Sequence, residues 1–181
     1  MFNSNFNISF EGIQIIKTTK ISSIKTVMKT FEKLNFPESS LKIKYDNLKP
    51  FVFDNIRKKW LVLTPEEWVR QHLINYLIIH KNYPASLISL EAGLKYNTLS
   101  KRTDVLIYNK SGKPFLIIEC KAPKISIDQK VIEQIGVYNK TKDATYLCVT
   151  NGLKHYCWSY NEIENKFIFL QEIPDFKEIS S

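Results

Sequence analysis

The sequence predicts an α/β domain built around a mixed β-sheet. Two segments, residues 64–81 and 128–140, carry apolar side chains at helical spacing, and short β-type runs lie between and after them. The order is therefore a helix, three strands, a second helix and a further strand, with extra β-hairpins on either side of this core. A length of 181 residues, 44% of them hydrophobic and 24% charged, suits one globular domain with a sizeable core.

Charge is concentrated in the first third of the chain. Eleven Lys and Arg against five Asp and Glu give residues 1–60 a net charge of +6, out of +8 for the whole chain. This excess suits a polyanionic partner such as nucleic acid, but a lysine-rich surface that only aids solubility explains it equally well. We expect residues 1–40 to form a basic appendage, either strand-like or poorly ordered, and residues 41–181 to form the domain. Met28 is an alternative start site, because "MKTFEKLNFP" resembles the beginning of a protein.

A hairpin and a helix are predicted first along the domain. Residues 51–63 form two β-type runs around a polar Asp-Asn centre, which indicates a hairpin. Thr64 then provides an N-cap, Pro65 stands at the first helical position, and Glu67 completes a capping box. The apolar spacing predicts a helix that continues to about Lys81, shortly before Pro84.

Strands and a second helix follow. Polar turn residues separate the apolar runs, and an Asn-Gly pair marks a tight turn between two of them. The predicted strands are residues 86–96, 103–109 and 115–121, then, after the helix at 128–140, two strands within 144–160 and a last one within 166–173.

Several functional classes are excluded or disfavoured by the residues present. Cys120, Cys148 and Cys157 form no CxxC pair and lie in apolar runs, so we expect reduced core thiols in a cytoplasmic protein. The three histidines have no zinc-ligand spacing with them. No apolar run is long enough to span a membrane, no signal peptide opens the sequence, and no GxxxxGK[ST] phosphate loop occurs. We therefore expect no membrane association and no P-loop ATPase motor.

The segment "FLIIECK" places charges at the end of a buried strand. Residues two apart in a strand share a face, so Glu119 and Lys121 point one way, and Ile118 and Cys120 point the other way, into the core. Asp104 begins the preceding strand. If these two strands form an antiparallel hairpin, Asp104 lies beside Glu119 and Lys121 at one end of the sheet.

This grouping is suited to a hard divalent cation. Asp104 and Glu119 supply two carboxylates, and the backbone carbonyl of Cys120 can supply a third oxygen. Such a cation stabilises charge on a phosphate and lowers the pKa of bound water, while an ammonium such as that of Lys121 can orient the water. We expect Mg²⁺ or Mn²⁺ as the cofactor.

The same residues resemble a known family. The pattern of Asp104 followed by Glu119-Cys120-Lys121 is similar to that of the PD-(D/E)XK nuclease superfamily, which implies a restriction-endonuclease-like core. The segments "TPEEWVRQHLINYL", "KRTD", "IIECKAP", "QIGVY" and "VTNG" together resemble the N-terminal nuclease domain of type I restriction enzyme R subunits. This likeness covers roughly residues 40–160. Thr103 departs from the proline in the family's name, and the helicase-like motor of a full R subunit does not occur in this sequence.

The resemblance implies roles for individual residues. Asp104 and Glu119 would be metal ligands and Lys121 the catalytic lysine. Gln134 and Tyr138 match a QxxxY element that lies near the active site and engages the substrate backbone. Glu67 matches an acidic residue of the first helix that assists metal binding in some members, although the capping box alone also explains it.

DNA is the partner that the resemblance implies, together with a separate motor or specificity subunit. Lys101, Arg102 and Lys124 are candidate contacts to DNA phosphates. The site chemistry acts on phosphate and does not distinguish DNA from RNA, and the oligomeric state stays open. Two alternatives remain: the charged triplet can be a structural ion pair at a sheet edge, and the domain can be a non-catalytic module that binds DNA or protein with the same fold.

Overall fold

The structure is a computed structural model, and it describes residues 8–10, 13–16, 31–96, 99–161, 163–164 and 166–176. Within these ranges, some positions are described by their backbone alone. These are residues 8–10, 13–16, 91–96, 99–102, 134, 137–138 and 140–142.

The predicted order of helices and strands is confirmed. Helix α2 (Pro65–Ile79) is followed by strands β6 (Ile88–Tyr96), β7 (Leu99–Tyr108) and β8 (Pro114–Cys120), helix α3 (Gln129–Lys142) and strand β9 (Tyr146–Thr150). Strands β10 (His155–Asn161) and β11 (Lys166–Leu170) complete the domain, and a short 3₁₀ helix, η1 (Ala85–Leu87), precedes β6. Helix α2 ends two residues before the predicted end at Lys81.

These six strands form one mixed sheet in the order β11-β10-β9-β8-β7-β6. The pair β8 and β9 is parallel, because α3 connects them as a crossover, and the other neighbours are antiparallel. Strands β9 and β10 pair as the Asn-Gly turn predicted, and Gly152 in that turn has φ +81°. A Cβ at Gly152 would lie 2.7 Å from the Leu34 side chain, so the turn requires glycine for both reasons.

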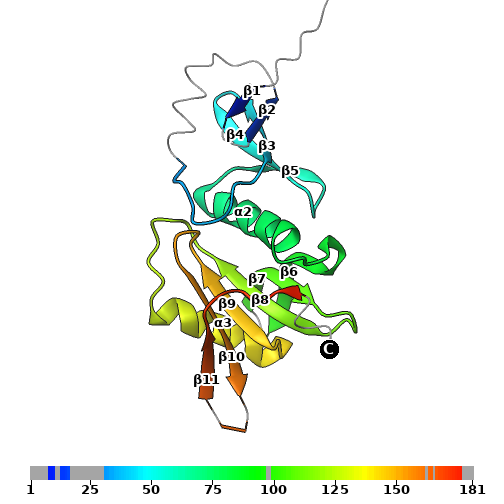
Figure 1. The fold of residues 1–181 in the computed structure, drawn as a ribbon, viewed down its shortest axis with the longest axis vertical. Helices are drawn as coiled ribbons and strands as arrows, with labels where there is room; N and C mark the ends of the chain where they lie inside the picture. Colours follow the sequence, from blue (N-terminus) through cyan, green and yellow to red (C-terminus); the bar gives the residue numbers. More distant parts are fainter. Residues whose placement is uncertain are drawn as a thin grey trace, which may run out of the picture.

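A second sheet, larger than the single hairpin that the sequence predicted, covers the other side of α2 (Figure 1). It has five strands in the order β1 (Ile8–Phe10), β2 (Ile13–Ile16), β3 (Leu41–Asp46), β4 (Lys49–Asp54) and β5 (Lys59–Val62). Strand β2 pairs in parallel with β3, which brings part of the N-terminal segment into this sheet. The proposed boundary near residue 40 stays a prediction, and Met28 lies outside the described residues.

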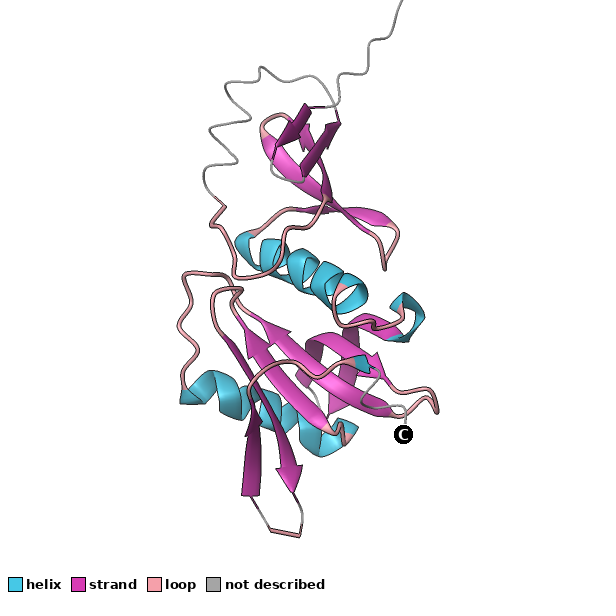
Figure 2. Ribbon diagram, viewed as in Figure 1, coloured by secondary structure: helices cyan, strands magenta, loops and turns pink. Residues whose placement is uncertain are grey.

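Helix α2 lies between the two sheets, and α3 covers the opposite face of the six-stranded sheet (Figure 2). Side chains of β3 and β4 (Ile43, Val52), of α2 (Leu73) and of β8 (Leu116, Ile118) belong to one buried cluster. A second cluster joins the other face of β7, β8 and β9 to α3. This packing decides which face of each strand is buried, and it places the first turns of α2 beside the middle of β7, where Arg70 reaches Asp104, and near the end of β8.

The three cysteines are free thiols and all three are buried, as predicted. In the part of the chain that the structure describes, no helix combines the length and the apolar character needed to cross a membrane.

Candidate metal and phosphate site

Asp104 and Glu119 come together where the pairing of β7 with β8 stops. The prediction that Asp104 begins its strand is wrong, because β7 starts at Leu99 and its first residues continue the pairing with β6, which leaves Asp104 in the middle of β7. Strands β7 and β8 form an antiparallel hairpin with Val105 opposite Ile118, so the next position along places Asp104 opposite Glu119. The Cys120 backbone N–H donates to Asp104 Oδ2 at 2.8 Å. The predicted adjacency of the two carboxylates is therefore confirmed.

Glu119 is buried, and Lys121 is partly exposed beside it. Lys121 Nζ donates to Glu119 Oε1 at 2.7 Å, while Glu119 is only 5% exposed. Burial, with a further contribution from the nearby negative charge of Asp104, raises the pKa of Glu119 to about 7 even though Lys121 acts against it. Burial alone would lower the pKa of Lys121, but pairing with Glu119 raises it instead, so Lys121 carries a positive charge. Cys120 points into the core, as strand alternation predicted.

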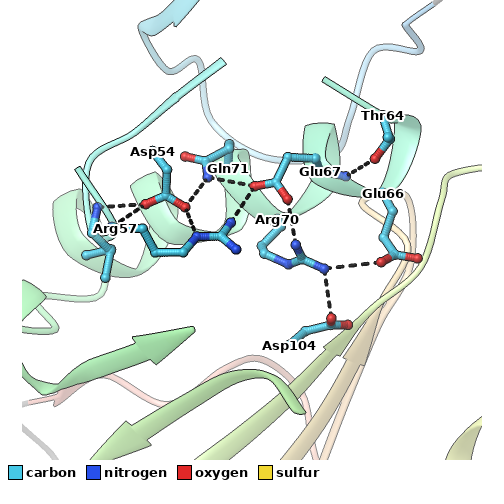
Figure 3. Close-up of polar contacts among 9 residues, drawn as sticks. Asp54, Arg57, Thr64, Glu66, Glu67, Arg70, Gln71 and Asp104 are labelled. Atoms are coloured by element: carbon cyan, nitrogen blue, oxygen red, sulfur yellow. Dashed lines mark hydrogen bonds and ion pairs between the residues drawn. The ribbon is translucent and has the colours of Figure 1, made fainter. Parts of the chain in front are cut away.

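Arg70, which the sequence reasoning did not select, joins this group from α2 (Figure 3). Its Nη2 lies 2.7 Å from Asp104 Oδ1 and 3.1 Å from Glu66 Oε1, and its Nη1 lies 2.5 Å from Glu67 Oε2. The Arg70 side chain is 6% exposed, so these charge-assisted contacts form largely away from water. Arg70 therefore holds the helix terminus against the predicted site.

A second arginine extends the network into the five-stranded sheet. Arg57 pairs with Asp54 at 2.6 Å and with Glu67 Oε1 at 3.1 Å, and Gln71 donates to both carboxylates (Figure 3). Asp54 Oδ1 also accepts the backbone N–H of Arg57, which closes the turn between β4 and β5. A continuous chain of ion pairs thus runs from this turn through α2 to Asp104.

The capping box predicted at the start of α2 is half correct. Thr64 Oγ1 accepts the Glu67 N–H at 3.1 Å, which is the N-cap contact. The Glu67 carboxylate, however, does not return to the Thr64 N–H, which donates to the Val62 carbonyl instead. Arg57, Arg70 and Gln71 provide donors for this carboxylate, so it turns inward. Glu67 reaches Asp104 only through Arg70, and its role as a metal ligand stays a prediction.

The donors at the strand ends fit a divalent cation such as Mg²⁺. Asp104 and Glu119 are hard oxygen ligands. Burial and, to a lesser extent, the charge of Asp104 raise the pKa of Glu119, and a bound cation would offset the cost of ionising both carboxyls. Arg70 occupies Asp104 Oδ1, so a cation there would require this guanidinium to withdraw. Among the described side chains, no three from His, Cys, Asp and Glu form a preassembled cluster. Binding of a cation here would therefore depend on two carboxylates and one backbone oxygen. The Cys120 carbonyl is the predicted source of this oxygen.

The other predicted residues lie around this site or outside the described side chains. Gln134 and Tyr138 belong to α3, and Lys101 and Arg102 belong to β7, but the structure does not describe these four side chains. Lys124 is exposed on the segment that follows β8. Its contact to phosphate, like those of Lys101 and Arg102, stays a prediction.

Asn151 secures the segment that leaves the site. The sequence predicts only a turn at this residue. In the structure its side-chain amide donates to the Ile125 carbonyl at 2.9 Å, and its Oδ1 accepts the N–H groups of Leu153 and Lys154. The Lys121 N–H donates to the Thr150 carbonyl at 2.8 Å. The end of β9 thereby positions the Lys121 backbone. The motif "VTNG" was the sequence signal for this role.

Replacing Glu119 with glutamine is expected to stabilise the cation-free protein at pH 8 by about 1 to 2 kcal/mol. The folded-state pKa of about 7 lies above the ordinary value of 4.5, so Glu119 lowers the folding stability progressively as pH rises from about 4.5 to about 7, and the full cost is present at pH 8. The stabilisation should vanish near pH 4, below the ordinary pKa of 4.5, where Glu119 is neutral in both the folded and the unfolded wild-type protein. Urea unfolding in EDTA at both pH values measures the difference. A destabilised variant at pH 8 would show that the ion pair with Lys121 outweighs the cost of burial.

Comparison with known proteins identifies the family. A solved fragment described as the HsdR subunit of a type I restriction enzyme from Vibrio vulnificus YJ016 is 17% identical, with a TM-score of 0.37, and the match covers 50% of this chain and 19% of that one. The chain thus spans about a fifth of that solved fragment, and so low a TM-score does not establish a shared fold. No protein with a curated description matches. The family profile "Type I restriction enzyme R protein N terminus" matches residues 65–174, more than half of the chain and the whole segment from α2 to beyond β11. This chain therefore belongs to the family of type I restriction enzyme R protein N-terminal domains.

Proposed function

We propose that this chain is a Mg²⁺- or Mn²⁺-dependent nuclease domain of the PD-(D/E)XK type that hydrolyses DNA phosphodiester bonds. The observation that carries the proposal is the placement of Asp104, Glu119 and Lys121 at one end of an antiparallel hairpin, in a member of the R protein N-terminal family. Two adjacent carboxylates and an ammonium are what metal-assisted attack on a phosphate needs. DNA and a separate motor or specificity subunit are the partners that this function implies.

The residues of the site have distinct roles in this proposal. A divalent cation, when bound, would polarise the phosphate and lower the pKa of the attacking water. Asp104 and Glu119 would hold it, and the Cys120 N–H fixes the orientation of the Asp104 carboxylate. The Lys121 ammonium, kept protonated by Glu119, orients the water and offsets the negative charge that develops on the phosphate oxygens. Lys121 is partly exposed, so substrate can reach it.

Arg70 acts as a positioning residue. Without a divalent cation its guanidinium offsets the charge of Asp104 and keeps this carboxylate in place. When a cation arrives, Glu66 and Glu67 offer the guanidinium other acceptors, because both already accept hydrogen bonds from it. The site can therefore exchange one positive charge for another without leaving Arg70 buried and unpaired.

The same contact supports a second candidate function. A guanidinium that permanently occupies Asp104 Oδ1 would take the place of a metal ion, and the domain would then be a catalytically inactive module that binds DNA or protein. Metal binding separates the two functions. Retention of DNA binding without any binding of Mn²⁺ would favour the module.

Purified protein with Mg²⁺ or Mn²⁺ is expected to nick supercoiled plasmid DNA, and EDTA should abolish this activity. Calorimetric titration with Mn²⁺ should show binding that Glu119→Gln weakens at least tenfold, because a carboxylate ligand is lost. A labelled RNA of matched sequence tests the preference for DNA. Absence of both cleavage and Mn²⁺ binding in folded protein would contradict the nuclease proposal, and cleavage of RNA alone would change the substrate.

A further inference from the structure

The outward face of strands β3, β4 and β5 carries lysine and aromatic side chains side by side. Alternate residues of these strands, such as Ile43 and Val52, point inward and are fully buried against α2. The residues between them point outward. We call this outward surface the basic–aromatic face, and it consists of Lys42, Lys44, Lys49, Phe51, Phe53 and Trp60.

The lysines of this face lie over its aromatic rings. Lys44 Nζ is 4.6 Å from the centre of the Trp60 ring and 5.8 Å from that of Phe51, and Lys42 Nζ is 5.9 Å from that of Phe53. Phe53 and Trp60 meet edge to face, with ring centres 5.3 Å apart. Each of the three rings packs beside a residue of the neighbouring strand, yet all three remain partly exposed to solvent. The sheet thus presents partly open aromatic surface under a row of positive charges.

The positive charge of this face favours an anionic partner. Among the outward residues of β3, β4 and β5 the single acidic side chain is Asp46, next to the turn that leads to Lys49. Lys42 and Lys44 are two residues apart on one strand, so their Cα atoms are roughly 7 Å apart and both face the same side. Such a row suits a chain of phosphates, and partly open aromatic rings suit the flat surfaces of bases. Each nucleotide of a nucleic-acid strand carries one phosphate and one base, so a strand can contact the lysines and the rings together. A protein or a lipid has no such repeat and would form fewer favourable contacts with this face.

We propose that the basic–aromatic face binds single-stranded nucleic acid, with its lysines on phosphates and Trp60, Phe53 and Phe51 against unpaired bases. Single strands fit better than duplex, because paired bases are stacked inside a duplex and cannot reach a sheet surface. This site lies apart from Asp104 and Glu119, and binding there requires no hydrolysis. The Asp54–Arg57–Glu67–Arg70 chain of ion pairs links the same sheet to Asp104, so the bound nucleic acid would be held by a sheet that ion pairs connect to the candidate site.

Fluorescence anisotropy with the whole chain, EDTA and a labelled oligothymidine of about 16 nucleotides tests the proposal. Trp60→Ala should weaken binding on the order of 5- to 100-fold, and Trp60→Phe should largely retain it, because base stacking is lost only in the first. Lys42→Ala with Lys44→Ala should lower the slope of log K against log salt by about 1.4. The matched control, Lys113→Ala with Lys130→Ala, removes the same charge from exposed positions in other elements and should leave the slope nearly unchanged.

Tryptophan fluorescence provides a readout that does not depend on how well Trp60→Ala folds. Trp68 and Trp158 are 6% and 2% exposed, so quenching by the oligonucleotide should arise from Trp60 and disappear in Trp60→Phe while binding persists. Equal losses in the two lysine double variants would overturn the proposal, since only net charge would then matter. So would unchanged affinity in folded Trp60→Ala, quenching that persists in Trp60→Phe, or duplex DNA that competes as well as the single strand.

Discussion

Lys121→Ala is expected to lower the rate of DNA hydrolysis by about 10²- to 10³-fold, the usual effect of removing one group that stabilises transition-state charge. Lys121 Nζ lies 2.7 Å from Glu119 and is the nearest ammonium to the two carboxylates in the described site. Its side chain is 19% exposed at the end of β8, so truncation leaves no cavity in the core. The Glu119 carboxyl can take up a proton when its partner is removed, which limits the loss of stability.

Single-turnover cleavage of supercoiled plasmid with Mg²⁺ measures the effect, and circular dichroism during thermal unfolding checks the fold. Lys113→Ala is the matched control, because it removes a lysine from the exposed turn between β7 and β8 and should cleave at the wild-type rate. Equal rates in Lys121→Ala and wild-type protein would assign the activity to another site or to a contaminating nuclease.

Arg70→Met is expected to lower the free energy of unfolding by about 3 to 5 kcal/mol in EDTA, the usual cost of removing one partner from a buried ion pair. Methionine fills a similar length but leaves Asp104 and Glu67 without the guanidinium that joins them. The loss should be smaller in Mn²⁺, because a cation bound by Asp104 would replace the missing charge. Urea unfolding with EDTA or Mn²⁺ measures both quantities.

Arg57→Met is the matched control for this effect. Arg57 pairs with Asp54 and Glu67 but has no contact with Asp104 among those described, so its loss should destabilise the protein without recovery in Mn²⁺. Equal recovery in the two variants would show that Mn²⁺ stabilises the protein elsewhere. An Arg70→Met variant as stable as wild type would show that the ion-pair network contributes nothing net to folding.

The core of the candidate site could be predicted because its geometry follows from local rules. Alternation along β8 places Glu119 and Lys121 on one face and Cys120 in the core, and a hairpin between consecutive strands brings Asp104 opposite Glu119. Both inferences need only strand periodicity and the pairing of neighbours along the chain. The order of helices and strands follows from the same local signals.

Other features depend on contacts between distant segments. Arg70 is separated from Asp104 by 34 residues, and no spacing rule indicates which of several carboxylates a helix arginine will reach. Glu67 illustrates the same point, because a capping box and a buried ion pair begin with the same residues, and only the nearby arginines and Gln71 decide between them.

The sequence by itself determined the helices, the strands of the six-stranded sheet, the β4–β5 hairpin, the face of β8 on which each side chain lies and the three residues of the candidate site, because these depend on periodicity within a few residues. It predicted neither β3 nor the pairing of β2 with it. Tertiary structure alone decided that α2 lies between two sheets, that Arg70 forms an ion pair with Asp104, and that Glu119 is buried enough for its pKa to rise to about 7. The physical reason is that burial and ion pairing depend on which surfaces pack together, and desolvation then sets the electrostatics of every group enclosed there.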